Sequence, residues 1–244
     1  MIIHDFYQTA VGRMACGFLW SAISPRLCGL HKNGRILLLG AGAAVADAVM
    51  QGTDCQVIVA NLSRCEPRWP KGQPHNTVVV DPHALPFGDV IFDHVVVLHG
   101  LEYAPLPEKM MGEIQRVLTA EGQATFIVPN RTGIWAWFDH TPWGEGRTFS
   151  PRQMRRLVRD SGLSPIVVES CLFVPPVDCS FHAIARGLAR LIENVGCYLR
   201  LGIGGVVLAS ARKQRYAGVP VKDMPVRVQS AKPAVITQHR SHRV

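Results

Sequence analysis

The 244-residue sequence lacks the features that mark several common functional classes. No apolar run approaches the roughly 18 residues that a membrane-spanning helix needs. The first residues, Met1-Ile-Ile-His-Asp-Phe-Tyr, lack the basic region and continuous apolar stretch of a secretory signal. The HExxH, GxSxG and Walker A motifs are also absent, which argues against a zinc peptidase, an α/β-type serine hydrolase and a P-loop nucleotidase. We therefore expect a cytoplasmic protein with no transmembrane segment.

Paired cysteines are missing as well. The chain has seven cysteines, an odd number, and no two of them have the CxxC spacing. This argues against a disulfide framework and a zinc knuckle, and it predicts reduced thiols and no metal site. The scattered cysteines are Cys16, Cys28, Cys55, Cys65, Cys171, Cys179 and Cys197.

The formal net charge of +8 is concentrated near the C-terminal end. Residues 211–244 contain eight Lys and Arg residues and one acidic residue, Asp223, so they carry +7 and the rest of the chain carries +1. A basic tail can attract RNA, acidic lipid headgroups or an acidic protein partner. Many such tails are instead simply solvated and flexible.

Hydrophobic periodicity divides the chain into three parts. Residues 1–34 are predicted to form an N-terminal helical region, residues 35–213 one α/β domain, and residues 214–244 a flexible tail. In the first part, apolar residues at helical spacing predict one helix over residues 6–27, with Pro25 closing it.

Strands and helices then alternate along the domain. Helices are predicted over residues 43–50, 108–118, 151–162 and 181–201, and Ser150 has the residue type and position of an N-cap. Glu121-Gly122 is predicted to be a turn. Strands that are apolar along their whole length, with helices between them, predict a parallel sheet covered on both faces. The predicted strands are residues 35–39, 56–60, 77–80, 94–98, 124–128, 166–169 and 205–211.

A glycine-containing loop, Gly40-Ala41-Gly42, follows the first strand and opens a helix. Glycine lets the backbone approach a ligand closely, and the free N–H groups of the helix favour an anionic or acceptor-rich group. A dinucleotide site begins in the same way, but its third glycine would fall at Val45, so a nicotinamide cofactor is poorly supported.

The most informative stretch is Asp81-Pro-His-Ala-Leu-Pro-Phe87, followed by Phe92-Asp93 and a strand of β-branched residues. A carboxylate just past a strand end can accept hydrogen bonds from an adenine amino group or a ribose. The alternative is an ordinary junction between two strands. The order of these residues resembles the type 11 group of class I S-adenosylmethionine-dependent methyltransferases, in which an acidic residue, a Leu-Pro-Phe and a Phe-Asp recur.

The resemblance implies a Rossmann-like fold with a seven-stranded, mostly parallel sheet, helices on both faces and an antiparallel last strand. It implies S-adenosylmethionine as the cofactor, and four positions depart from the family pattern: Leu38, Ala44, Asn61 and Pro82. The residues that it assigns to cofactor binding are Gly40, Ala41, Gly42, Asn61, Leu62, Asp81, Pro82, His83, Leu98 and His99.

His99 is the candidate catalytic residue, because an imidazole can accept a proton from a hydroxyl or amine nucleophile at neutral pH. It could instead cap the following helix or hydrogen-bond the cofactor. Trp135 and Trp137 lie in an aromatic loop that is either a substrate lid or packing across the sheet edge. The candidate substrate residues are Tyr7, Asn130, Arg131, Trp135 and Trp137, whereas the role implied for Glu113 and Arg116 is structural.

The sequence thus predicts S-adenosylmethionine-dependent methyl transfer. A small-molecule acceptor is expected, since the domain without its tail is nearly neutral and the Asp/Asn-Pro-Pro-Tyr/Phe and Pro-Cys motifs of base methylation are absent. The four departures favour an alternative, a catalytically inactive protein of this fold with a binding or regulatory role. A nicotinamide-dependent oxidoreductase is a weaker third interpretation.

Overall fold

The structure is a computed structural model of the chain. It describes residues 3–63, 68–70, 76–133, 135, 143, 146–175, 183–199 and 202–214, with side chains described from residue 187 onward in the last helix. Cys65, Trp137, Cys179 and most of the basic tail lie outside the described residues.

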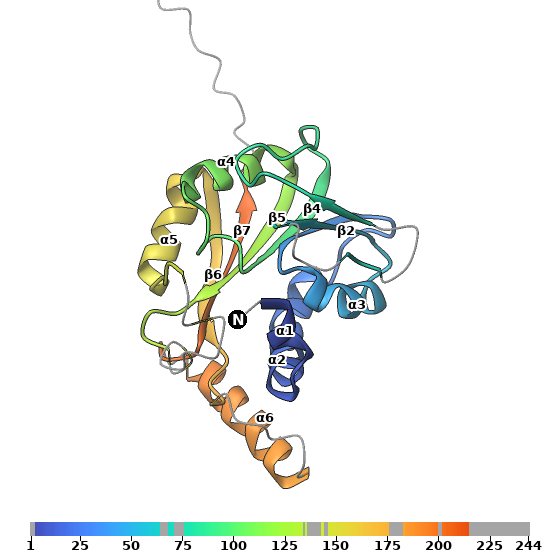
Figure 1. Cartoon of the computed structure of the whole chain (residues 1–244). Helices are drawn as coiled ribbons and strands as arrows, with labels where there is room; N and C mark the ends of the chain where they lie inside the picture. The colour runs from blue at the N-terminus through green and yellow to red at the C-terminus, as the bar shows by residue number, and fades with distance from the viewer. Residues whose placement is uncertain are drawn as a thin grey trace, which may run out of the picture.

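One seven-stranded sheet organises the molecule (Figure 1). Its strand order is β3-β2-β1-β4-β5-β7-β6; β1 to β5 pair in parallel, and β7 runs antiparallel to both of its neighbours. The predicted seven-stranded, mostly parallel sheet with an antiparallel last strand is therefore confirmed. The strands are β1 Arg35–Gly40, β2 Gln56–Asn61, β3 Thr77–Val79, β4 Phe92–Leu98, β5 Leu118–Pro129, β6 Leu163–Cys171 and β7 Val206–Lys213.

Alternate residues of the central strands supply two hydrophobic cores, one on each face of the sheet. Leu37 and Leu39 of β1 point to the face covered by α4 and α5, whereas Ile36 and Leu38 point to the face covered by α2 and α3. The helices are α1 Ile3–Gln8, α2 Ala10–Leu27, α3 Ala43–Gly52, α4 Pro107–Val117, α5 Pro151–Asp160 and α6 Ala183–Tyr198.

The N-terminal region differs from the prediction of a single helix. Thr9 separates α1 from α2 and is the N-cap of α2, where its hydroxyl oxygen accepts a hydrogen bond from the Gly12 N–H at 3.0 Å. Pro25 lies inside the last turn of α2 instead of closing it; only its own N–H is missing, and the Cys28 N–H still donates to the carbonyl oxygen of Ser24. The break at Thr9 lets α1 turn back against α2, and Tyr7 of α1 reaches His99 at the end of β4.

Two further predictions have clear outcomes. Ser150 caps α5 in a capping box with Gln153, as its residue type indicates. The predicted turn at Glu121-Gly122 is wrong, because β5 begins at Leu118 and continues through both residues.

Arg116 ties the loop after β3 to α4. Its guanidinium donates hydrogen bonds to the carbonyl oxygens of Leu85 and Phe87 at 3.0 and 2.7 Å, and it pairs with Glu113 and Asp89, each at 2.7 Å. These contacts lower the pKa of Glu113, chiefly through its hydrogen bond with Arg116. The Glu113–Arg116 pair thus has the structural role that the sequence implied, and it fixes the loop that begins at Asp81.

Candidate active site

The carboxyl ends of β1 and β4 meet where the glycine-containing loop begins. Gly40 has a φ of +81°, and a Cβ there would lie 2.3 Å from the carbonyl oxygen of Leu98. The Ala41 N–H donates to that same oxygen at 2.7 Å. Only glycine fits this contact, which brings the loop directly beside the residue that follows β4, His99.

His99 lies in a chain of hydrogen bonds that connects three side chains. Its Nδ1 lies 2.7 Å from Oε1 of Glu102, and its Nε2 lies 2.8 Å from the hydroxyl oxygen of Tyr7. A carboxylate can only accept, so Nδ1 carries the proton and Nε2 accepts from the Tyr7 hydroxyl. Glu102 therefore sets the tautomer of His99 and leaves Nε2 as the basic nitrogen.

This chain of hydrogen bonds is closed off from solvent. His99 is 2% exposed and Tyr7 is 4% exposed. Burial raises the pKa of Tyr7 well above its usual value, and the nearby Cys16 and Glu102 groups raise it further, so the phenol stays a hydrogen-bond donor at neutral pH. Among the described residues, Oε2 of Glu102 and Nε1 of Trp143 are buried without a hydrogen-bond partner.

Aromatic rings wall the site. The ring centroid of Trp143 lies 5.3 Å from that of His99, 5.1 Å from that of Phe6 and 4.7 Å from that of Trp135. Both tryptophans are fully buried, and Nε1 of Trp135 donates to the carbonyl oxygen of Val174 at 2.6 Å. Packing therefore accounts for these two tryptophans, although Trp143 also contacts the His99 ring. Trp137, the other predicted lid residue, lies outside the described residues.

A cavity of about 450 Å³ opens beside the site, at the N-terminus of α3. Tyr7 lines it, together with Ala43 and Ala44 of the first turn of α3. Its charged lining residues are Arg13, Arg68 and Asp47, and the carboxylate of Asp47 accepts a hydrogen bond from Nε1 of Trp69. The volume lies within the range of small-molecule pockets. Two guanidinium groups and the helix N-terminus make this cavity suitable for an anionic group.

The residues predicted to contact the adenosine part of a cofactor follow β2 and β3. Asn61 ends β2 with its side chain fully buried, and its carbonyl oxygen accepts from the Val80 N–H at 2.9 Å. Asp81 is exposed, and its Oδ1 accepts from the His83 N–H at 2.8 Å. Its Oδ2 makes no hydrogen bond with the described residues. The His83 N–H, which was expected to compensate for the missing N–H of Pro82, is thus already used by Asp81.

The other predicted residues lie at strand ends but do not join the His99 group. The side-chain amide of Asn130 donates to the carbonyl oxygens of Gly202 and Gly204 at 2.9 and 2.7 Å, which ties β5 to the turn before β7. Arg131 is exposed beside it. Leu62 lies near Gly100, where an added Cβ would be 3.5 Å from its Cδ1.

A comparison with family models finds a match within the domain. Residues 37–126, which run from β1 into β5, match the type 11 methyltransferase family, described as a methyltransferase domain. The fold is that of a class I methyltransferase. The resemblance seen in the sequence is thereby confirmed, and the comparisons support a methyltransferase. No curated protein matches the sequence.

Solved structures agree on the fold. A chain from the complex between the Haloferax volcanii Trm112 methyltransferase activator and a methyltransferase is 18% identical, with a TM-score of 0.59, covering 88% of this chain and 98% of that one. Burkholderia thailandensis 1,6-didemethyltoxoflavin-N1-methyltransferase, solved with S-adenosylhomocysteine, is also 18% identical, with a TM-score of 0.57 and coverages of 87% and 84%. The cyclase SpnF is 17% identical, with a TM-score of 0.57 and coverages of 85% and 83%.

Proposed function

We propose that this protein transfers a methyl group from S-adenosylmethionine to a small-molecule acceptor at the Tyr7–His99–Glu102 site. The observation that carries the proposal is the buried hydrogen-bonded chain itself, in which the imidazole of His99 lies between Glu102 and Tyr7, beside the Gly40 loop. The family match and a related fold that binds S-adenosylhomocysteine support the choice of cofactor.

The residues around the strand ends fit this cofactor in part. Asp81 keeps one carboxylate oxygen for an adenine amino group, and we assign the buried amide of Asn61, at the end of β2, to the ribose. Arg13 and Arg68 supply positive charge for a carboxylate in the neighbouring cavity. Pro82 is the poorest match, because it has no N–H and the next N–H is already used by Asp81.

The cofactor, when bound, supplies an electrophilic methyl group. His99 would supply the base: its Nε2 would accept the proton of the acceptor hydroxyl or amine, while the electron pair of the broken methyl–sulfur bond would stay on the sulfur of the departing S-adenosylhomocysteine. Glu102 stabilises the resulting imidazolium through the hydrogen bond to Nδ1–H. General-base catalysis of this kind contributes about 10²- to 10⁴-fold to a rate.

The walls of the site indicate the kind of acceptor. Phe6 and Trp143 present aromatic rings to the site. The polar groups described beside these rings are those of Tyr7, His99 and Glu102 and the indole N–H of Trp143. A flat or apolar molecule with one ionisable O–H or N–H group suits such walls. A polyanionic acceptor does not, because a buried carboxylate already lies among them.

One observation favours a second function, binding without catalysis. The site is closed in the described structure, since Tyr7 and His99 are almost wholly buried and the hydroxyl of Tyr7 occupies Nε2. The related cyclase SpnF also has this fold, so the fold does not fix the reaction. In this alternative, the Tyr7–His99–Glu102 chain would stabilise a regulatory or binding protein.

Titration calorimetry with S-adenosylhomocysteine tests the cofactor site on which the enzymatic proposal depends. We expect micromolar binding that Asp81→Ala weakens at least about tenfold, the effect of losing one charge-assisted hydrogen bond. Asp54→Ala, which removes an exposed carboxylate at the opposite end of β2, is the control and should bind normally. Absence of binding up to millimolar ligand would refute the enzymatic proposal and favour the second function.

A further inference from the structure

Helix α6 is held at the end of β6. Its Glu193 accepts hydrogen bonds from the N–H groups of Leu172 and Phe173, both at 2.7 Å. Gly196 lies so close to the Phe173 ring that an added Cβ would be 2.4 Å from it. Beyond these contacts the helix projects away from the sheet (Figure 1).

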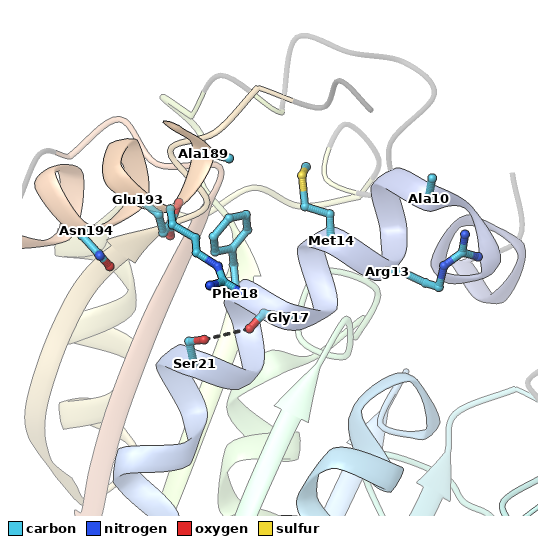
Figure 2. A pocket seen from close by; sticks show the side chains of 10 residues that line it. Ala10, Arg13, Met14, Gly17, Phe18, Ser21, Ala189, Glu193 and Asn194 are labelled. Atoms are coloured by element: carbon cyan, nitrogen blue, oxygen red, sulfur yellow. Dashed lines mark hydrogen bonds between the residues drawn. The ribbon is translucent and has the colours of Figure 1, made fainter. Parts of the chain in front are cut away.

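A groove separates another side of α6 from α2. Figure 2 shows Met14 and Phe18 of α2 along one wall and Glu193 and Asn194 of α6 along the other. The groove has a volume of about 510 Å³. Because α2 stands across this groove, the described contacts that position α6 are mainly those with β6 and the residues after it.

Two cysteines meet at this contact, one from each side of it. Cys171 is the last residue of β6, directly before Leu172, and it is 1% exposed. Cys197 is exposed and follows Glu193 by one helical turn, with its Sγ 3.9 Å from Oε1 of Glu193. The same Oε1 accepts the Leu172 N–H. The two thiols are hydrogen-bonded to each other, and both are free in the structure.

The hydrogen bond between the two thiols makes them unequal. It lowers the pKa of Cys197, although partial burial and the carboxylates of Glu193 and Glu169 act in the opposite direction. The same hydrogen bond, together with burial, raises the pKa of Cys171 well above its usual value. The thiolate is the form of cysteine that reacts with oxidants, and it must be accessible to them. Cys197 is therefore the thiol that an oxidant reaches first, with the protonated Cys171 beside it.

We propose that Cys171 and Cys197 are a site of oxidation by peroxides, at which they form a reversible disulfide between β6 and α6. First, the Cys197 thiolate attacks one oxygen of hydrogen peroxide. An S–O bond forms, the O–O bond breaks, and its electron pair leaves on the other oxygen as hydroxide, which takes a proton from solvent. Next, the sulfur of Cys171 forms the S–S bond while the S–O bond of the Cys197 sulfenic acid breaks. The departing hydroxide takes the Cys171 proton, so the two thiols lose two electrons and the peroxide becomes two waters.

Other described cysteines lie in different surroundings. Burial raises the pKa of Cys16 to about 12, which leaves almost no thiolate at neutral pH. Cys28 is exposed, as Cys197 is, but its thiol donates to the carbonyl oxygen of Ser24 at 3.3 Å. Cys28 therefore shares the exposure of Cys197 without a hydrogen bond from a second thiol, and it is the matched control.

The disulfide would change how α6 is attached. It would add a covalent bond where the hydrogen bonds of Glu193 now hold the helix, and it would close a loop over residues 171–197. A cross-link of this kind restricts the open states of the segment that it closes. Oxidation would therefore fix the α6 wall of the groove relative to the sheet.

Peptide mass spectrometry of the full-length protein treated with hydrogen peroxide tests the proposal, which goes beyond the proposed function and needs no methyl donor. In the wild type we expect linked peptides that contain Cys171 and Cys197 and that dithiothreitol separates. The free thiol of Cys197 should disappear at least about threefold faster than that of Cys28. Cys171→Ala should leave Cys197 as a sulfenic acid that dimedone traps, because the second thiol is missing. Cys28→Ser should form the linked peptides as the wild type does.

Three results with the wild type would overturn the proposal, whether or not Cys171→Ala folds. These are no linked peptides after peroxide treatment, loss of the Cys28 thiol as fast as that of Cys197, or a disulfide that joins Cys197 to a cysteine other than Cys171, in the same chain or in a second one. Hydrogen exchange of the oxidised and reduced wild type tests the effect on α6. Residues 187–196 should exchange at least about tenfold more slowly after oxidation, and equal exchange would contradict the attachment of α6 by the disulfide.

Discussion

His94 provides a sharp test of the buried polar structure in the centre of the sheet. It lies in β4, fully buried, with Nε2 3.0 Å from the hydroxyl oxygen of Thr125. Its Nδ1 makes no hydrogen bond with the described residues. Burial lowers the pKa of His94 from 6.5 to about 4, and the positive charge of Arg26 adds to this effect. The folded protein therefore holds His94 neutral where the unfolded chain would protonate it.

The sign and size of the effect follow from proton linkage. Between pH 6.5 and 4 the unfolded chain binds a proton that the folded chain excludes, so the free energy of unfolding falls as the pH falls through this window. Above pH 6.5 the contribution is complete. At pH 5 a pKa difference of this size removes about 2 kcal/mol relative to pH 7.5, since one unit corresponds to about 1.36 kcal/mol.

Urea unfolding of the wild type and His94→Gln at pH 7.5 and pH 5 measures this quantity. Glutamine cannot become protonated, so the variant should lose about 2 kcal/mol less than the wild type between the two pH values. His31→Gln, which replaces an exposed histidine, should leave the wild-type difference unchanged. If His94→Gln loses as much stability as the wild type between pH 7.5 and pH 5, the interpretation that the folded protein holds His94 neutral is wrong.

Three further substitutions test the glycine-containing loop after β1, the anchor of the loop after β3, and the Tyr7–His99 hydrogen bond. Gly40→Ala should destabilise the protein by more than about 2 kcal/mol in urea unfolding, because its Cβ would clash with a backbone oxygen. Its control is Gly112→Ala, at an open position in a helix, which should stabilise the protein by about 0.5–1 kcal/mol. Arg116→Met should lower the free energy of unfolding by about 1–3 kcal/mol, because it removes hydrogen bonds to two carbonyl oxygens. Its control is Arg156→Met: the side chain of Arg156 is 85% exposed, so the free energy of unfolding should change by less than about 0.5 kcal/mol. Tyr7→Phe should cost about 1–3 kcal/mol, because a buried imidazole nitrogen loses its donor; an unchanged midpoint would refute that hydrogen bond.

The structural features that the sequence predicted correctly are those that depend on residues close together in the chain. Continuous apolar stretches located the strands, and Ser150 with Pro151 located the start of α5, because both signals act within a few residues. Gly40 was recognisable from its place between a strand and a helix. Local patterns of residues therefore suffice to predict the strands of the sheet and the loop at the cofactor side.

Long-range contacts could not be predicted in the same way. Tyr7 and His99 are 92 residues apart, and no local pattern indicates that a short N-terminal helix returns to the end of β4. Glu102 follows His99 by three residues, and the sequence shows this proximity but not the hydrogen bond between the two side chains. Periodicity also failed to show which side of α6 is covered, since an apolar stripe has the same pattern whether it faces a core or solvent.

The two hydrogen-bond partners of His99 belong to different parts of the fold, and this difference determines how an acceptor would have to enter the proposed site. Glu102 follows His99 by three residues at the end of a central strand, whereas Tyr7 belongs to α1, a helix of six residues. Because Nε2 has a single lone pair, an acceptor can reach it only by displacing the Tyr7 hydroxyl. Displacement of Tyr7 leaves the bond between Nδ1 and Glu102 intact, so the tautomer of His99 is set before the acceptor arrives. In the proposed reaction, Glu102, and not Tyr7, would therefore be the residue that makes His99 a base.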